Sequence, residues 1–90
     1  MTVERTVTVV NKLGLHARAA AKLVTLASKF RSDVRIRNGT REVSGKSIMG
    51  VMMLAAGKGT RITLVVDGDD AEHALDQLCA LVADKFGEGA

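Results

Sequence analysis

The sequence contains few aromatic residues and only one cysteine. Its 90 residues include two phenylalanines, Phe30 and Phe86, and no tryptophan or tyrosine. Modules that bind nucleic acid by stacking bases on aromatic side chains are therefore not expected. The single cysteine, Cys79, excludes an internal disulfide and a cysteine-based metal cluster. With no Lys or Arg within a helical turn of it, Cys79 is predicted to be a small buried hydrophobic residue.

Long hydrophobic stretches are also missing. The longest apolar run, residues 48–57, is about half as long as a bilayer crossing requires. The first five residues contain no apolar signal region, so we expect a cytoplasmic protein that contacts no membrane. Hydrophobic residues make up 47% of the chain and charged residues 26%, which is typical of a folded domain. The length predicts a single domain over residues 1–90.

Charge is distributed unevenly along the chain. Residues 1–61 contain twelve Lys or Arg and three Asp or Glu, a net charge of +9, whereas residues 62–90 contain one Lys and seven acidic residues, a net charge of −6. A basic segment favours an acidic partner surface or an anionic group. Ordinary solvated charge explains the same distribution equally well.

Hydrophobic periodicity predicts seven elements. Alternating apolar residues indicate strands, and segments with helical spacing of apolar residues lie between them. Arg5 is a mismatch on the apolar face of the first strand. Asn38-Gly39 predicts a tight hairpin, Ser47 a helix cap, and Asp69 to Glu72 a capping box. The expected strands are 3–9, 34–37, 40–44 and 62–66, and the expected helices are 17–30, 47–54 and 71–86.

The order β-α-β-β-α-β-α, with one polar face on each strand, predicts an α+β fold. We expect a two-layer open-faced β-sandwich in which three helices cover one face of a four-stranded antiparallel sheet. The last four residues, 87–90, are expected to fray.

A candidate site lies where a loop becomes the helix at Ala17. The N–H groups of Ala17 and Arg18 lack intrahelical partners there, and a helix N-terminus favours anions. His16 at this edge supplies a nucleophile, because a neutral imidazole keeps a lone pair, and Arg18 supplies a cationic fork suited to phosphate. Such an arrangement favours phosphoryl transfer, which depends on positioning and charge stabilisation.

A histidine near a helix start is, on its own, more often a surface residue or a cap. His73, among Glu72 and Asp76 with no useful Gly or Arg nearby, is interpreted as such a solvated residue. No cluster has the spacing of metal ligands, and no metal or cofactor is predicted.

The segment 11–20 around His16 resembles the active-site segment of HPr, the histidine-containing phosphocarrier family of the bacterial phosphoenolpyruvate-dependent phosphotransferase system. Residues 46–52 resemble the regulatory-serine segment of the same family, and the turns at 57–59 and 67–70 are also similar. The similarity covers essentially the whole chain. It implies a phosphocarrier rather than an enzyme, which accepts a phosphoryl group from enzyme I on His16, at Nδ1, and passes it to a histidine of an enzyme II A component.

The resemblance also implies roles for further residues. Arg18 would stabilise the phosphoryl group, and Ser47 would be phosphorylated by HPr kinase/phosphorylase in organisms that possess this enzyme. Ile48, Met49 and Met52 would dock partners beside the histidine, and we add Lys22 to this surface. Residues 53–56 are expected to pack inward, and the protein is expected to be a monomer.

One residue departs from the family pattern. HPr proteins usually carry proline after the arginine of the motif, whereas this chain has Ala19. Alanine is a good helix former, so the fold and the role of His16 should be unaffected. The change adds a backbone donor near the phosphate, so it bears on the rate of transfer and on the choice of partner.

The sequence fits more than one branch of the family and more than one class of protein. Lys12-Leu13-Gly14 resembles the nitrogen-related regulatory branch of the system, whereas Lys46 to Gly50 resembles the sugar-uptake branch. A second interpretation belongs to a different class of protein: a binding module that docks acidic partners through its basic face without being phosphorylated. A third interpretation, an RNA-binding domain, is weakened by the lack of stacking aromatics.

Overall fold

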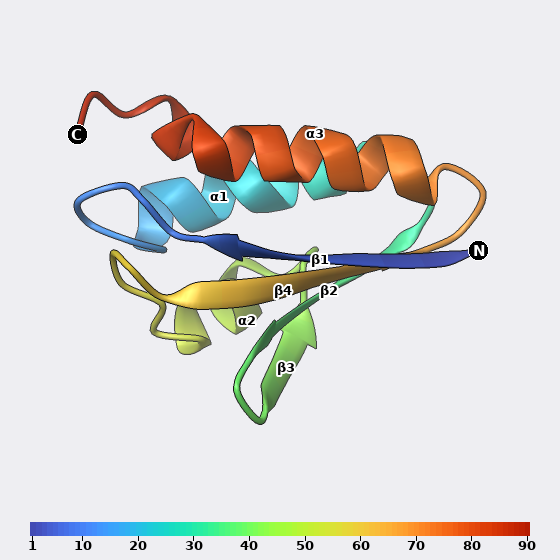
Figure 1. Ribbon diagram of the computed structural model, residues 1–90, viewed down its shortest axis with the longest axis horizontal. Helices are drawn as coiled ribbons and strands as arrows, with labels where there is room; N and C mark the ends of the chain where they lie inside the picture. The colour runs from blue at the N-terminus through green and yellow to red at the C-terminus, as the bar shows by residue number, and fades with distance from the viewer.

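The computed structural model describes residues 1–90, which form four strands, three α-helices and one short 3₁₀-helix. Figure 1 shows their arrangement. In chain order the elements are β1 (Thr2–Thr8), α1 (Ala17–Ala27), β2 (Asp33–Asn38), β3 (Arg41–Ser44), α2 (Ile48–Met53), β4 (Arg61–Asp67), α3 (Ala71–Ala83) and η1 (Lys85–Gly87). This order confirms the β-α-β-β-α-β-α sequence of elements.

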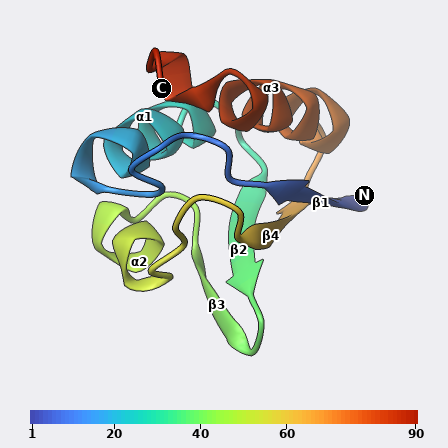
Figure 2. The ribbon, with the colours of Figure 1, turned by 60° about the vertical axis from the view of Figure 1, so that its left-hand side comes forward.

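The four strands form one antiparallel sheet in the order β1-β4-β2-β3. Helices α1 and α3 lie side by side over one face of the sheet, and α2 packs against α1 and β3 (Figures 1 and 2). The predicted open-faced α+β sandwich is confirmed. No helix has the length and apolar character that spanning a membrane requires.

Strand alternation decides which face of the sheet the helices cover. Val34 and Ile36 on β2 are completely buried beneath the helices, as are the alternate residues of β4. The opposite face remains polar, and Arg37 pairs there with Glu4 at 3.6 Å and with Glu42 at 3.8 Å. One core of 20 buried residues therefore lies between the sheet and the helices.

Arg5, the mismatch on the apolar face of β1, is explained by a helix distant in sequence. Its guanidinium donates to the carboxylate of Asp76 on α3 at 3.3 Å, at the margin of the core. It also lies beside Cys79, which is half-buried rather than fully buried. Burial raises the pKa of the Cys79 thiol above its ordinary value. Arg5 is therefore a cation close to Cys79 in space, although no Lys or Arg lies near Cys79 along α3.

The predicted capping box before α3 is wrong. The N-cap of α3 is Asp70, and its side chain makes no cap hydrogen bond. Its carboxylate instead accepts hydrogen bonds from the backbone N–H groups of Arg31 and Ser32, each at 3.0 Å, and from the Ser32 hydroxyl. Asp70 therefore fastens the turn between α1 and β2 to the start of α3.

We expect the Asp70 contacts to make stability depend on pH. The bond from the Ser32 hydroxyl, followed by that from the Arg31 amide, lowers the pKa of Asp70 below its ordinary value. A carboxyl whose pKa is lowered by folding stabilises the fold above its unfolded pKa, about 3.9, and this contribution disappears as the pH falls through the folded pKa. Asp70→Asn should therefore lower the urea midpoint at pH 7, and the gap to wild type should shrink below about pH 4.

The matched control is Asp69→Asn, which removes an exposed neighbouring carboxylate that forms no side-chain hydrogen bond or ion pair. It should leave the urea midpoint unchanged at both pH values. A gap for Asp70→Asn that stays constant as the pH falls would contradict this account.

Candidate functional site

The loop before α1 is fixed by close contact with the segment that follows α2. Gly14 has φ +66°, and a Cβ built on it would lie 2.5 Å from the carbonyl oxygen of Ala56. The next residue, Leu15, is buried and its N–H donates to the same carbonyl at 2.9 Å. This contact places the following residue, His16, at the first turn of α1.

His16 is the N-cap of α1, with extended backbone (φ −71°, ψ 176°). Its carbonyl accepts from the Ala20 N–H at 2.8 Å, but its side chain does not cap the helix. No acidic residue occupies the first turn. The positive end of the helix dipole, at the N–H groups of Ala17 and Arg18, is therefore not neutralised by an acidic side chain of the helix.

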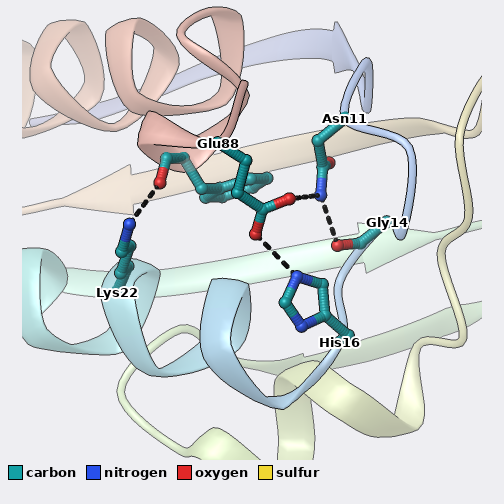
Figure 3. A network of polar contacts seen from close by, with 6 residues as sticks. Asn11, Gly14, His16, Lys22 and Glu88 are labelled. Atoms are coloured by element: carbon teal, nitrogen blue, oxygen red, sulfur yellow. Dashed lines mark hydrogen bonds and ion pairs between the residues drawn. The ribbon is translucent and has the colours of Figure 1, made fainter. Parts of the chain in front are cut away.

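The imidazole of His16 contacts a residue near the other end of the chain. Its Nε2 lies 2.6 Å from Oε2 of Glu88, while Oε1 of Glu88 accepts from Nδ2 of Asn11 at 3.0 Å. Nδ2 of Asn11 also donates to the carbonyl of Gly14 at 2.8 Å. Figure 3 shows this chain of contacts, in which the second ring nitrogen, Nδ1, faces away from Glu88. No protein group hydrogen-bonds to Nδ1.

The expectation that residues 87–90 fray is wrong for Glu88. Phe86 is completely buried, and its carbonyl accepts from Nζ of Lys22 on α1 at 2.7 Å. The Glu88 N–H donates to the Lys85 carbonyl at 3.0 Å. Together these contacts hold Glu88 against the His16 loop, and only 17% of its side chain is exposed.

The carboxyl of Glu88 is held in its charged form by the donors around it. The hydrogen bond from Asn11, followed by that from His16, lowers the pKa of Glu88 below its ordinary value. Sequence reasoning missed this residue because its spacing from His16 along the chain carries no signal. The buried Phe86, which anchors the segment, was the only indication that the chain end returns to the core.

A shallow hollow of about 340 Å³ lies beside His16. It is lined by Lys12, Leu13, His16, Arg18, Glu88 and Ala90. The guanidinium of Arg18 is exposed and forms no ion pair within the protein. The hollow therefore brings together the imidazole, a cation without a fixed partner and the N-terminus of α1, which suits an incoming anion.

Ala19 occupies the third position of α1, directly after Arg18 in the sequence. It is completely buried, and its backbone N–H lies in the first turn, where helical N–H groups lack intrahelical partners. The proline that is usual in the family would lose no helical hydrogen bond at this position. Ala19 therefore leaves the helix start intact and adds one backbone donor to it.

Ser47 is the N-cap of α2, as predicted. Its Oγ accepts from the Gly50 N–H at 3.1 Å and caps the helix. Three apolar residues that follow Ser47 on α2 are exposed to solvent, Ile48 by 43%, Met49 by 72% and Met52 by 40%. These three residues form an apolar surface on α2, the helix that packs against α1.

The expectation that residues 53–56 all pack inward is only half right. Leu54 and Ala56 are buried, but Met53 is 59% exposed and Ala55 is also exposed. The helix ends at Met53, and Ala55 adopts φ +52°, so helical periodicity does not continue beyond that point. Leu13, 67% exposed in the His16 loop, is a further apolar residue that the sequence did not single out.

Lys22 occupies a different environment from the other residues assigned to docking. It is half-buried, and its ammonium group is bound to the Phe86 carbonyl. The structure thus gives Lys22 an internal contact, and its role toward partners stays a prediction.

The fold and this site define a small α+β domain that presents one histidine at a helix N-terminus. The sequence model of the family described as "PTS HPr component phosphorylation site" matches residues 3–84. The chain belongs to the HPr family, the phosphocarrier proteins of the phosphotransferase system.

Relatives along nearly the whole chain include both named branches of the family. The chain is 57% identical over 86 residues to phosphocarrier protein HPr of Cupriavidus necator, covering 96% of this chain and 97% of that one. It is 52% identical over 87 residues to phosphocarrier protein NPr of Shewanella violacea, covering 97% and 96% respectively.

A solved structure confirms the fold. The crystal structure of HPr from Thermoanaerobacter tengcongensis superimposes with a TM-score of 0.94 at 43% identity, covering 98% of this chain and 99% of that one.

Gly14 provides a test of how the loop positions His16. In Gly14→Ala the new methyl group would collide with the Ala56 carbonyl, in addition to the strain of positive φ. We expect a loss of about 1–2 kcal/mol from the left-handed backbone and about 1–3 kcal/mol more from overpacking. Urea unfolding measures the loss, and the amide spectrum should show a displaced 11–16 loop.

Gly39→Ala is the matched control. Gly39 has nearly the same φ, +62°, but a Cβ there has no neighbour within 4 Å. This variant should show only the backbone strain. Equal losses in the two variants would rule out the close approach at Ala56 as the constraint on the loop.

Proposed function

We propose that this protein carries a phosphoryl group on His16 between enzyme I and an enzyme II A component. The observation that carries the proposal is the placement of His16 at an uncapped helix N-terminus, with Nε2 bound to Glu88 and Nδ1 without a partner. The nitrogen that remains available is the one that the family resemblance implies. The protein is then a substrate of two enzymes in turn, and not an enzyme in its own right.

The chemistry requires only one bond to form and one to break. The Nδ1 lone pair forms the N–P bond as the bond from phosphorus to its donor atom on enzyme I breaks, and the bonding electrons stay with the donor. Nε2 keeps its proton throughout. The exposed Arg18 and the N–H groups of Ala17 and Arg18 balance the charge of the phosphoryl oxygens. The reverse sequence delivers the group to the acceptor histidine.

Partners would dock on the surface around the site. Ile48, Met49 and Met52 expose apolar side chains on α2, and Leu13 extends this surface from the His16 loop. Methionine side chains adapt to different contours, which suits a protein that must bind a donor and several acceptors at one face. The twelve basic residues of the first two-thirds of the chain favour acidic partner surfaces.

We expect the protein to act as a monomer, with residues 1–90 as a single carrier domain; the location of the proposed groups within one chain supports this. With this function we expect the protein to act in the cytoplasm. Relatives named HPr and NPr are both similar along nearly the whole chain, so transfer to enzyme II A components of the sugar-uptake and nitrogen-related branches should be compared directly.

His16→Ala should abolish phosphorylation. Incubation with phosphoenolpyruvate and enzyme I from the same organism should add one acid-labile phosphate to wild type, measured as intact mass, and none to the variant. Arg18→Ala should slow the transfer by about ten- to hundredfold, because it removes one charge-stabilising group. Arg35→Ala, on the sheet face that the helices leave open, is the control and should transfer at the wild-type rate.

Phosphorylation of His16→Ala would reject this site. Failure of wild type to gain phosphate, with enzyme I shown to phosphorylate itself, would favour the binding module that docks acidic partners without being phosphorylated.

We further propose that Ser47 is a regulatory phosphorylation site. Its hydroxyl lies at the start of α2, directly before the exposed Ile48 and Met49, so a phosphate there would place nearly two negative charges beside the docking surface. The start of a helix tolerates this charge, and the fold should persist. Docking of partners that approach a basic, apolar face would be weakened.

Ser47→Ala should lose about 1 kcal/mol of stability through the missing cap and should accept no phosphate from HPr kinase/phosphorylase and ATP. Ser44→Ala, which removes another hydroxyl three residues earlier, should still be modified once. Modification of Ser47→Ala, or none of wild type by an active kinase, would exclude Ser47 as the regulated residue.

A further inference from the structure

The polar contacts around His16 form a chain with a fixed direction of hydrogen-bond donation. The Gly14 carbonyl can only accept, so the group of Asn11 that faces it at 2.8 Å must be Nδ2. The second proton of Nδ2 is directed to Oε1 of Glu88 at 3.0 Å. The Gly14 carbonyl therefore sets the orientation of the Asn11 amide. In this orientation the amide requires a hydrogen-bond acceptor at the position of Glu88.

The opposite orientation of Asn11 is strongly disfavoured. Asn11 is completely buried, and its Oδ1 has no hydrogen-bond partner. Rotating the amide would place this oxygen against two acceptors and would remove both bonds made by Nδ2. The protein thus tolerates one unpaired buried oxygen and keeps Nδ2 directed at Glu88.

Glu88 must accept hydrogen bonds on both sides. One of its oxygens receives the Asn11 proton, and the other lies 2.6 Å from Nε2 of His16. An ionised carboxylate accepts at both oxygens and has no proton to donate, so the proton in the second contact belongs to Nε2. A neutral imidazole that donates from Nε2 has its lone pair on Nδ1.

We propose that Glu88 is a positioning residue that fixes His16 in the Nε2–H tautomer and thereby makes Nδ1 the nucleophile. The inference deepens the proposed function and depends on it for its purpose, although the tautomer itself can be measured without any transfer. In the transfer step, Nε2 retains its proton, and the positive charge that the ring acquires when Nδ1 binds phosphorus faces the Glu88 carboxylate. The same contact selects the nitrogen and stabilises the phosphorylated ring.

Glu88 is held in place independently of His16. The buried Phe86 anchors the segment, and Lys22 on α1 fixes its carbonyl at 2.7 Å. The carboxylate is therefore presented to the imidazole by the fold, as a second group must be when it orients a catalytic histidine.

Glu88→Gln provides a sharp test because it keeps the shape of the side chain and changes the direction of donation. Asn11 still requires an acceptor, so the carboxamide oxygen should face Asn11 and its NH₂ group should face Nε2. Nε2 must then accept, and the proton moves to Nδ1. We expect the preferred tautomer of His16 to invert in Glu88→Gln, and to become a mixture in Glu88→Ala, in which water contacts both nitrogens.

The measurement uses protein labelled with ¹⁵N in histidine, at a pH of about 8.5, where an ordinary imidazole with a pKa of about 6.5 is neutral. Long-range ¹H–¹⁵N spectra identify which ring nitrogen carries the proton. Asp84→Ala, which removes an exposed carboxylate from the same segment, is the control and should keep the wild-type tautomer. The exposed His73 provides an internal reference in every spectrum.

Phosphoryl transfer from enzyme I is measured on the same variants. Glu88→Gln should slow it by about tenfold or more, in proportion to the lost population of the reactive tautomer, whereas Asp84→Ala should not. An Nδ1–H tautomer in wild type, or unchanged tautomers in both Glu88 variants, would overturn the proposal even if His16 is phosphorylated. Conversely, the predicted inversion without any phosphorylation of wild type would retain the role of Glu88 toward the ring and reject the proposed function.

Discussion

The contact between His16 and the Glu88 carboxylate is the interaction on which the site depends. It joins the loop before α1 to the segment after α3, 72 residues later in the chain. Neither end of the contact is free to move: Asn11 and Gly14 hold the loop side, and Phe86 and Lys22 hold the other. A single imidazole on a surface loop, which would otherwise rotate and exchange tautomers, acquires a defined orientation.

This arrangement separates the tasks that a phosphoryl carrier must perform. One edge of the imidazole faces a fixed carboxylate, while the other edge, the N-terminus of α1 and the unpaired Arg18 are accessible, and there we propose that the phosphoryl group binds. The hollow is shallow and its apolar neighbours are exposed, which would let an acceptor reach a phosphoryl group bound there. In this proposal the group would be held by its bond to the imidazole and by nearby positive charge, which would allow it to leave as readily as it arrives.

The sequence predicted the element order well because that information is local. Alternation in β2 and β4 and helical spacing in α1 and α3 each reflect burial of one face, and that burial is what the structure shows. Predictions failed where the contacts of a residue are with residues distant in the sequence. Asp is a residue type that often caps helices, but Asp70 binds the turn at Arg31 and Ser32. Arg5 interrupts an apolar face because it pairs with Asp76 on α3. Met53 was expected inside and is exposed because α2 ends there.

The sequence by itself determined the fold class, the position of His16 at a helix start, the proximity of Arg18 and the serine that caps α2, because each follows from neighbours within a few residues. Only the tertiary structure decided what His16 contacts. Glu88 lies in a short polar tail with no periodicity and would be interpreted as disordered, yet the burial of Phe86 brings it back to the loop. Hydrogen-bond direction is a property of atoms brought together by folding, so no spacing along the chain encodes which imidazole nitrogen keeps its proton.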